Sequence, residues 1–273
     1  MIIGNREFDT ENKCYVMGIL NVTPDSFYDG GKWKTLDSVL SCAEDMLNQG
    51  ADIIDIGGES TWPGYDSISE QEETDRVIPV VEALRCRFAA PLSIDTCKSV
   101  VAAEALRAGA DMVNDIWALR RDPDMAGVVA LSGAVCCLMH NRENINYSGF
   151  MQDLLMDLSE SVSLAEKAGI SSEKIILDPG IGFGKTYEMN LEAINGLHLI
   201  KKLGYPLLLG VSRKSVVGIA LDLPVTERLE GSLAAAVIGV MRGCSFIRVH
   251  DVRETKRAVK MAEAILKSGI NQE

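Results

Sequence analysis

Several apolar runs in this chain end abruptly in a polar or charged residue. Asp95 follows the run APLSI, Asn114 follows DMV, and Asp178 follows KIIL. Near the C-terminus, Arg248 and His250 close the run SFIRVH. Strands that repeatedly end in this way are typical of a parallel sheet whose carboxyl edge carries the functional side chains, because the loops leaving that edge build the site. The pattern therefore predicts a parallel sheet with a polar site at one edge.

The strand-like runs hold five to seven mostly apolar residues without alternation, as expected when both faces of a strand are buried. They alternate with segments that carry apolar residues at helical spacing. We predict strands at 15–20, 51–57, 91–95, 111–115, 134–139, 174–178, 206–211 and 245–249. We predict helices at 35–48, 70–87, 100–109, 123–132, 152–168, 188–203, 226–242 and 251–267.

Eight strand–helix units with right-handed crossovers can close a sheet on itself, which predicts an α/β fold of the (β/α)8 TIM-barrel type. The alternative is an open doubly wound sheet, which would not need eight near-equal units. Residues 2–9 are predicted to form an N-terminal β-hairpin around Gly4 and Asn5 that covers the barrel floor. No interior linker or change of composition divides the chain, so we expect residues 1–273 to form a single domain.

Three predicted connections are too long to serve only as joints: 21–34, 58–69 and 140–151. All three leave the same end of the predicted barrel. Long loops that contain Gly and Pro at such an end often bind ligands or close over them. We therefore expect the site to lie beneath these connections.

The composition limits the classes of partner. The chain has a formal net charge of −12 at pH 7, which argues against binding to nucleic acid or to an anionic membrane surface. It permits an anionic substrate, because a local cluster of cations acts within a Debye length. No run approaches membrane-spanning length, and the segment MIIGNREFDT has no basic stretch followed by an apolar one, so we expect no secretory signal. Seven scattered cysteines without CxxC spacing favour a cytoplasmic protein with neither disulfides nor a zinc site.

Arg248 and His250 are two residues apart on a predicted strand, so both side chains point to the same face. A guanidinium and an imidazole there suit a phosphate or pyrophosphate group, to which Arg donates paired hydrogen bonds. The alternative is an ion pair with Asp251 or another surface carboxylate. Asn21 at the end of the first strand, and the position on strand eight where barrels often bind phosphate, favour the phosphate site.

Asp95, Asn114 and Asp178 are expected to converge on the barrel mouth. Two carboxylates and an amide could form a planar array that accepts hydrogen bonds from a heterocycle with adjacent N–H donors. They could instead hold a divalent metal, which favours oxygen ligands. A third possibility is that one of them caps the helix that follows it.

Lys214 lies just past strand seven in LLLGVSRKS, where its charge could meet a ring carbonyl or a carboxylate, or could stay exposed without a role. The segment DPGIGFGK (178–185) lacks the GxxxxGK[ST] frame of a phosphate-binding loop. We interpret it as a close backbone approach to a flat ligand, with Phe183 as a stacking or wall residue. His140 and His198 are weaker candidates, and His198 is interpreted as structural.

The chain resembles the dihydropteroate synthase family in seven blocks, which occur in the family's order: GILNVTPDSFYDGG, ADIIDIGGEST-PG, PLSIDT, GADMVNDI, DPGIGFGK, GVSRKS and IRVHDV. This set is specific, although no single block is. The resemblance implies a (β/α)8 transferase of folate biosynthesis. It implies that 6-hydroxymethyl-7,8-dihydropterin pyrophosphate and p-aminobenzoate are its small-molecule partners, that Mg²⁺ is its cofactor, and that it is a homodimer formed through the C-terminal helices.

The resemblance also implies which residues bind the substrates. The pterin would be held by Asp95, Asn114, Asp178 and Lys214. The pyrophosphate would be bound by Asn21, Arg248 and His250, with Asn21 also a ligand of Mg²⁺, while Thr61, Asp25 and Asp29 would organise phosphate and metal. The p-aminobenzoate pocket would contain Phe27, Pro63, Phe183, Lys214 and Ser215. The catalytic set would be Asp29, Asp95, Lys214, Arg248 and His250.

The chemistry of such a transfer fits these residue types. Loss of pyrophosphate builds negative charge that Mg²⁺, Arg248 and His250 could stabilise. The pterin methylene gains positive charge that Asp95 could offset, and the aromatic amine has a free lone pair at neutral pH. Closure of the long loops would exclude water from the intermediate.

One block departs from the family pattern. The family usually reads STRPG where this chain reads STWPG, so Trp62 removes a cation with five hydrogen-bond donors. Every other block is intact, which favours retained activity. Two other functions stay open: a pterin-binding methyltransferase domain, which would not need the NVTPDSF loop, and a synthase-like paralogue that binds pterin without turnover, which only Trp62 suggests.

Overall fold

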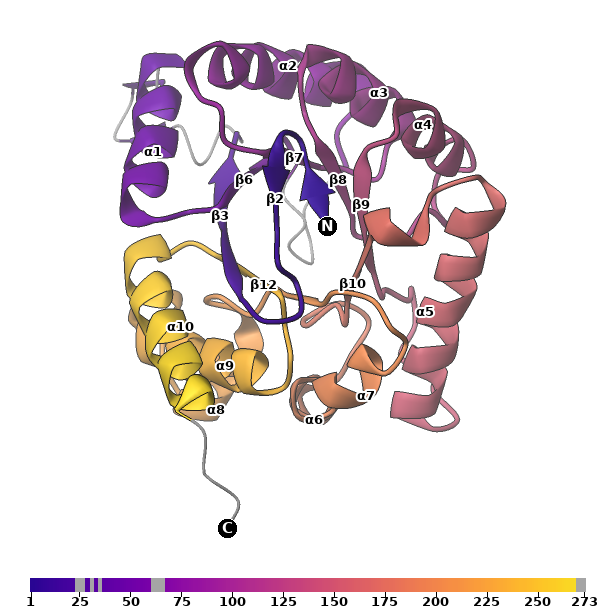
Figure 1. Ribbon diagram of the computed structural model, residues 1–273, viewed down its shortest axis with the longest axis vertical. Helices are drawn as coiled ribbons and strands as arrows, with labels where there is room; N and C mark the ends of the chain where they lie inside the picture. Colours follow the sequence, from indigo (N-terminus) through magenta and orange to yellow (C-terminus); the bar gives the residue numbers. More distant parts are fainter. Residues whose placement is uncertain (23–27, 30–31, 34–35, 60–66, 269–273) are drawn as a thin grey trace.

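The computed structural model describes residues 1–22, 28–29, 32–33, 36–59 and 67–268, with only the backbone at 28–29 and 32–33. Its centre is a parallel sheet with the strand order β10-β9-β8-β7-β6-β3-β12-β11. A parallel bridge between Leu177 and Leu207 joins the two outermost strands, so the sheet forms a near-closed barrel (Figure 1). The eight strands are β3 (Tyr15–Asn21), β6 (Ile53–Gly57), β7 (Leu92–Asp95), β8 (Met112–Asp115), β9 (Val135–Met139), β10 (Ile175–Asp178), β11 (Leu208–Leu209) and β12 (Phe246–Val249). The predicted (β/α)8 TIM barrel is confirmed.

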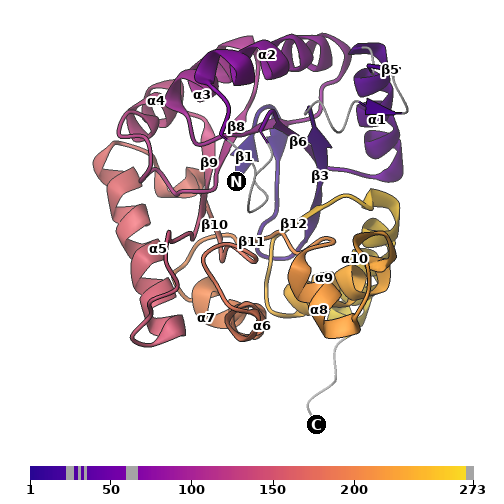
Figure 2. The ribbon, with the colours of Figure 1, turned by 180° about the vertical axis from the view of Figure 1, so that it is seen from behind.

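Helices surround the barrel on its outside, as Figures 1 and 2 show from its two ends. They are α1 (Leu36–Gln49), α2 (Glu70–Arg87), α3 (Ser99–Ala108), α4 (Met125–Ser132), α5 (Phe150–Lys167), α6 (Tyr187–Asn195), α7 (Leu197–Lys201), α8 (Ser215–Leu221), α9 (Leu229–Met241) and α10 (Val252–Lys267). Local signals set their ends: the Ser69 side chain accepts the Glu72 N–H before α2, and Gly109 with φ 115° ends α3. Within the described ranges, no helix combines the length and apolar character needed to cross a membrane.

The strands separate two apolar layers. Outward side chains such as Val16, Ile54 and Ile247 belong to the core between strands and helices. Inward side chains such as Met17 and Ile53 form a separate inner cluster. Because both faces are covered, every residue of β6 and of β9 is buried, which explains why these runs carry no alternation.

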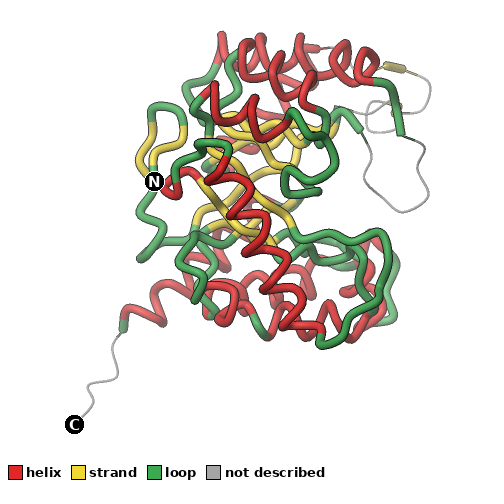
Figure 3. Tube along the Cα trace, turned by 90° about the vertical axis from the view of Figure 1, so that its right-hand side faces the viewer, coloured by secondary structure: helices red, strands yellow, loops and turns green. Residues whose placement is uncertain are grey.

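An N-terminal hairpin covers one end of the barrel, which we call the floor (Figures 1 and 3). It consists of β1 (Ile2–Ile3) and β2 (Arg6–Glu7), and Ile3 joins the inner cluster. The Phe8 ring that follows lies 4.7 Å from the ring of Tyr15 and 5.8 Å from that of Phe246. The hairpin predicted at 2–9 is confirmed. The opposite end, where the strands reach their carboxyl termini, is the barrel mouth.

A few elements differ from the prediction. The strand expected at 206–211 contains only Leu208–Leu209, and the helix expected at 188–203 is divided at Gly196 into α6 and α7. The segment SVVGIAL forms the unpredicted helix α8. Short 3-10 turns occur at Ser172–Lys174 and Val225–Glu227, and β4 (Tyr28–Asp29) pairs with β5 (Lys32–Trp33).

Candidate active site

Four strands place an apolar residue in the inner cluster and a polar residue two positions later. The pairs are Ile53 and Asp55 on β6, Met112 and Asn114 on β8, Ile176 and Asp178 on β10, and Phe246 and Arg248 on β12. Residues two apart on a strand share a face, so the polar members form the next layer toward the mouth. Three of them, Asn114, Asp178 and Arg248, are among the residues expected to converge there.

The Arg248 guanidinium binds two carboxylates in this layer. Its Nε donates to Asp55 Oδ2 at 2.5 Å and its Nη2 to Asp95 Oδ2 at 2.5 Å. Asn114 Nδ2 also donates to Asp55 Oδ2, at 3.3 Å. The Oδ1 atoms of Asp55 and Asp95 are buried and receive no hydrogen bond from the described residues. Burial, opposed by Arg248 and reinforced by Asp55, raises the pKa of Asp95 to about 7.

Asp178 and Lys214 lie beside this cluster. Lys214 Nζ donates to the Ile181 carbonyl at 2.5 Å. Burial raises the pKa of Asp178, while Lys214 lowers it; burial lowers the pKa of Lys214 to about 8, while Asp178 raises it. A Cβ placed on Gly210 would lie 3.7 Å from Lys214 Nζ and 3.9 Å from both Arg248 Cβ and Asp178 Oδ2. Glycine at this position therefore keeps an open space among three charged side chains.

Asn21 lies at the end of β3 and is exposed at the mouth. A Cβ on Gly57 would lie 3.6 Å from Asn21 Oδ1 and 3.8 Å from Asp95 Oδ2, so the two oxygens border the same small space. Such oxygen donors are those that Mg²⁺ prefers. Within the described ranges, no group of three or more His, Cys, Asp or Glu side chains is arranged to hold a metal.

Asp95, Asn114 and Asp178 do not cap the helices that follow them. The residues at the N-cap positions of α3, α4 and α6 are Lys98, Asp124 and Thr186. The helix-capping alternative is therefore wrong for all three, and their side chains remain available to the mouth.

His250 lies at the rim, where its Nδ1 is 3.0 Å from Ser212 Oγ. The loss of hydration there and the positive charges of Arg248 and Arg213 lower the pKa of His250 to about 4, so the imidazole is neutral at pH 7. Asp251 pairs with Arg213. The alternative ion pair between Arg248 and Asp251 is therefore wrong; Arg248 pairs instead with the carboxylates of Asp55 and Asp95 inside the mouth.

The remaining expected residues are described unequally. Phe183 lies beside Lys214, whose Nζ is 4.8 Å from the ring centroid, and Ser215 is the exposed first residue of α8. Asp29 is described only as backbone in β4. Four expected residues, Asp25, Phe27, Thr61 and Pro63, and the unusual Trp62 lie outside the described residues.

Two parts of the site were missed in the sequence. Asp55 interrupts the apolar run of β6, and a carboxylate inside a buried strand was the available signal. Lys185 was judged only as a failed phosphate-loop lysine, yet its Nζ contacts His140 and two loop carbonyls. No spacing in the sequence indicates those contacts.

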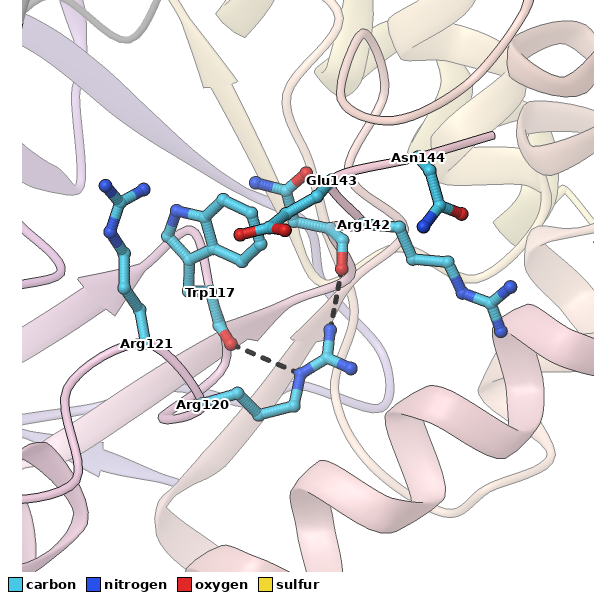
Figure 4. Close-up of a pocket in the computed structure, with 7 residues that line it drawn as sticks. Trp117, Arg120, Arg121, Arg142, Glu143 and Asn144 are labelled. Carbon is cyan, nitrogen blue, oxygen red and sulfur yellow. Dashed lines mark hydrogen bonds between the residues drawn. The ribbon is translucent and has the colours of Figure 1, made fainter. Parts of the chain in front are cut away.

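A hollow of about 520 Å³ lies beside the mouth between the segments that follow β8 and β9 (Figure 4). Its lining residues are Trp117, Arg120, Arg121, Asn141, Arg142, Glu143 and Asn144. Figure 4 shows the Arg142 side chain extending away from Trp117, and its guanidinium binds Asp157 of α5. Arg142 thus connects one wall of this hollow to Asp157 behind the mouth.

Comparisons with known proteins agree on one group. Residues 17–250 match the family model of pterin binding enzymes. The chain is 55% identical to the dihydropteroate synthase of Clostridium beijerinckii, over 98% of this chain and all of that protein. It superimposes with a TM-score of 0.92 and 48% identity on a Clostridium difficile dihydropteroate synthase solved in the presence of pteroic acid, covering 95% and 99% of the two chains. A Xanthomonas albilineans dihydropteroate synthase solved with 4-aminobenzoic acid gives a TM-score of 0.91 at 39% identity, covering 94% and 95%.

Proposed function

The chain belongs to the dihydropteroate synthases of the pterin-binding enzyme family, and from this premise we propose that its barrel mouth binds and aligns both substrates. It is a transferase of folate biosynthesis. The reaction joins 6-hydroxymethyl-7,8-dihydropterin pyrophosphate to p-aminobenzoate and releases pyrophosphate. Each substrate-binding residue of the mouth must therefore help to hold a flat ring, a diphosphate or an aromatic amine.

The observation that carries the proposal is the surplus of carboxylate oxygens in the mouth. Asp55 and Asp95 share the single guanidinium of Arg248, and each keeps one oxygen that receives no hydrogen bond from the described residues. An aminopyrimidine ring carries adjacent N–H donors, so a pterin supplies what these groups and Asp178 lack. Lys214 donates to the ring carbonyl. A Clostridium difficile dihydropteroate synthase solved in the presence of pteroic acid supports a pterin site in such a mouth.

We assign the pyrophosphate to the rim formed by Asn21, Arg248 and His250. Arg248 uses Nε and Nη2 for carboxylates, which leaves Nη1 for a phosphate oxygen. The neutral imidazole of His250 donates one hydrogen bond. The side-chain oxygen of Asn21 would hold Mg²⁺, which when bound would neutralise charge on the departing pyrophosphate.

In the transfer itself, the C–O bond breaks and its electron pair leaves with the pyrophosphate; the amine nitrogen then bonds to the pterin methylene, and the proton that the amine loses passes to solvent. Asp95 stabilises the positive charge on the methylene. Phe183, Lys214 and Ser215 hold the p-aminobenzoate, together with Phe27 and Pro63 of the long connections. The complex of the Xanthomonas albilineans enzyme with 4-aminobenzoic acid supports such a pocket.

We also infer a homodimer through the C-terminal helices. Ile238 and Met241 on α9, and Met261, Ile265 and Leu266 on α10, are large apolar side chains that the single chain leaves exposed. Gathered on neighbouring helices, such side chains commonly mark an interface between subunits. Sedimentation of the purified protein tests this directly, and a monomer at micromolar concentration would contradict it.

Purified protein supplied with both substrates and Mg²⁺ is expected to release pyrophosphate. Asp178→Asn keeps the size of the side chain but removes its charge, so the Kd for pteroic acid should rise about 10- to 100-fold. Glu173→Gln, at an exposed carboxylate before β10, is the control and should bind like the wild type. Wild-type protein that binds pteroic acid without releasing pyrophosphate would be a pterin-binding paralogue, and the proposal would be wrong.

A further inference from the structure

The Lys185 side chain lies where two loops meet behind the mouth. Its Nζ donates to the carbonyls of Gly180 and Phe183, both at 2.9 Å, and lies 2.8 Å from His140 Nδ1. The His140 carbonyl is farther away, at 3.3 Å. Burial lowers the pKa of Lys185 to about 7, while Asp178 raises it. In its protonated form the amino group has three N–H groups, and the three nearest acceptors use all of them. Lys185 therefore has no hydrogen bond left for a ligand and acts between the loops.

His140 connects this cation to the helix behind it. Its side chain is completely buried, with Nε2 2.9 Å from Asp157 Oδ2. Because a carboxylate only accepts hydrogen bonds, we assign the imidazole proton to Nε2, which leaves Nδ1 to accept from Lys185. Burial and the charge of Lys185 lower the pKa of His140 to about 3, which agrees with a neutral ring. Arg142 then holds Asp157 through Nε at 2.6 Å and Nη2 at 2.9 Å.

The two loops also touch through their backbones. Gly180 has φ 68°, and a Cβ on it would lie 1.9 Å from the His140 carbonyl oxygen. Gly184 has φ 53°, and a Cβ there would lie 2.5 Å from the Arg142 carbonyl oxygen. Only glycine allows this approach, because both the space and the conformation exclude a side chain. The lysine thus joins two segments already in direct contact.

The loop held in this way carries much of the mouth. Asp178 Oδ1 accepts the Gly180 N–H at 2.6 Å, and the Ile181 carbonyl accepts from Lys214. The Phe183 ring lies beside the same Lys214 ammonium. A shift of this loop would therefore move a carboxylate, a cation and an aromatic wall together.

We propose that Lys185 is a positioning residue for the reaction, which fixes Asp178, Phe183 and Lys214 in the substrate pockets through its contacts with two loop carbonyls and His140. The identity of those pockets rests on the function proposed above. Lys185 does not touch substrate; it determines where the groups that do so are held. We therefore expect loss of the Lys185 side chain to weaken binding of the pterin while the protein still folds.

The test compares Lys185→Ala and Lys185→Met with Lys174→Ala. Lys174 likewise donates to a backbone carbonyl, that of Gly133, but it lies before β10 at the floor side. We expect the Kd for pteroic acid and the KM for pterin pyrophosphate to rise on the order of 10- to 100-fold in both Lys185 variants. The Lys174 variant should match the wild type.

Chemical rescue separates positioning from general loss of structure. Propylammonium supplies the missing carbons and charge to the space left in Lys185→Ala and should recover binding, whereas 1-propanol should not. Recovery by 1-propanol as well, or an unchanged Kd in well-folded Lys185→Met, would overturn the proposal. If Lys185→Ala does not fold, the Kd measured on Lys185→Met decides. Failure of the wild type to bind pteroic acid would instead overturn the pocket assignment itself.

Discussion

At the scale of single residues, the mouth places two carboxylates, those of Asp55 and Asp95, around the single guanidinium of Arg248. Arg248 is shared by Asp55 and Asp95, so one of the two carboxylates is not neutralised within the cluster. Charge in a dry environment is costly, and the raised pKa of Asp95, about 7, reflects that cost. The cluster thus gives up stability to keep an acceptor for a ligand, a trade common at functional sites.

This cost predicts a pH-dependent stability. Asp95 holds its proton up to about pH 7 in the folded chain, but an unfolded Asp loses it near pH 4. The folded chain binds the Asp95 proton more tightly than the unfolded chain does. The stabilisation that Asp95 gives through this proton is therefore fully present below pH 4 and is lost as pH rises to 7. Asp95→Asn removes that loss. The free energy of unfolding of the variant minus that of the wild type should be more than about 1 kcal/mol larger at pH 8 than at pH 4.5. Urea unfolding measures this difference. The variant should also lose turnover.

Asp75→Asn on α2 is the control for this measurement, because Asp75 is an exposed carboxylate that accepts a hydrogen bond from Gln71 of the same helix. It should track the wild type at both pH values. An equal difference between Asp95→Asn and wild type at the two pH values would show that Asp95 is ionised throughout.

At the scale of elements, the loop after β10 owes its path to glycine rather than to regular hydrogen bonding. Gly180→Ala would push a methyl group against the His140 carbonyl from a backbone with φ 68°. We expect a loss of about 3 kcal/mol or more in the free energy of unfolding, together with weaker binding of pteroic acid. Gly204→Ala is the matched control, since Gly204 has φ 90° but no atom within 4 Å of its Cβ position. It should lose only about 1–2 kcal/mol and keep wild-type binding; equal losses at both positions would contradict the loop contact.

The sequence predicted some of these elements and contacts but not others. Continuous apolar runs ending in Asp95, Asn114, Asp178 and Arg248 were sufficient for the barrel and for much of its mouth, because strand periodicity alone orients those side chains. Helix α8 was missed because SVVGIAL is short and has no polar face. The contacts of Lys185 could not be predicted, because two of them are with backbone carbonyls, which every residue carries, and the third is with His140, far away in the sequence.

At the scale of the whole molecule, the floor and the mouth are separate layers. Phe8 is buried against Tyr15 and Phe246, below the polar groups. Phe8→Ala should lower the free energy of unfolding by about 3 kcal/mol through the cavity that it leaves. The kcat of the folded enzyme should not change, because no polar group of the mouth moves. Ile2→Ala, on the exposed side of the same hairpin, should change neither quantity by much. A reduced kcat in folded Phe8→Ala would show that the layers are coupled.

The contact between Phe8 and Phe246 also bears on how the chain is made. Phe8, which precedes the first barrel strand, packs against Phe246 on the last barrel strand, which is synthesised much later. Each strand–helix unit can form locally as it emerges from the ribosome. The barrel, however, has no complete inner apolar cluster until β12 has been synthesised. A nascent chain stalled before residue 246 would hold Phe8 and Tyr15 without that neighbour, and such a chain is a natural substrate for a chaperone that binds exposed aromatic side chains.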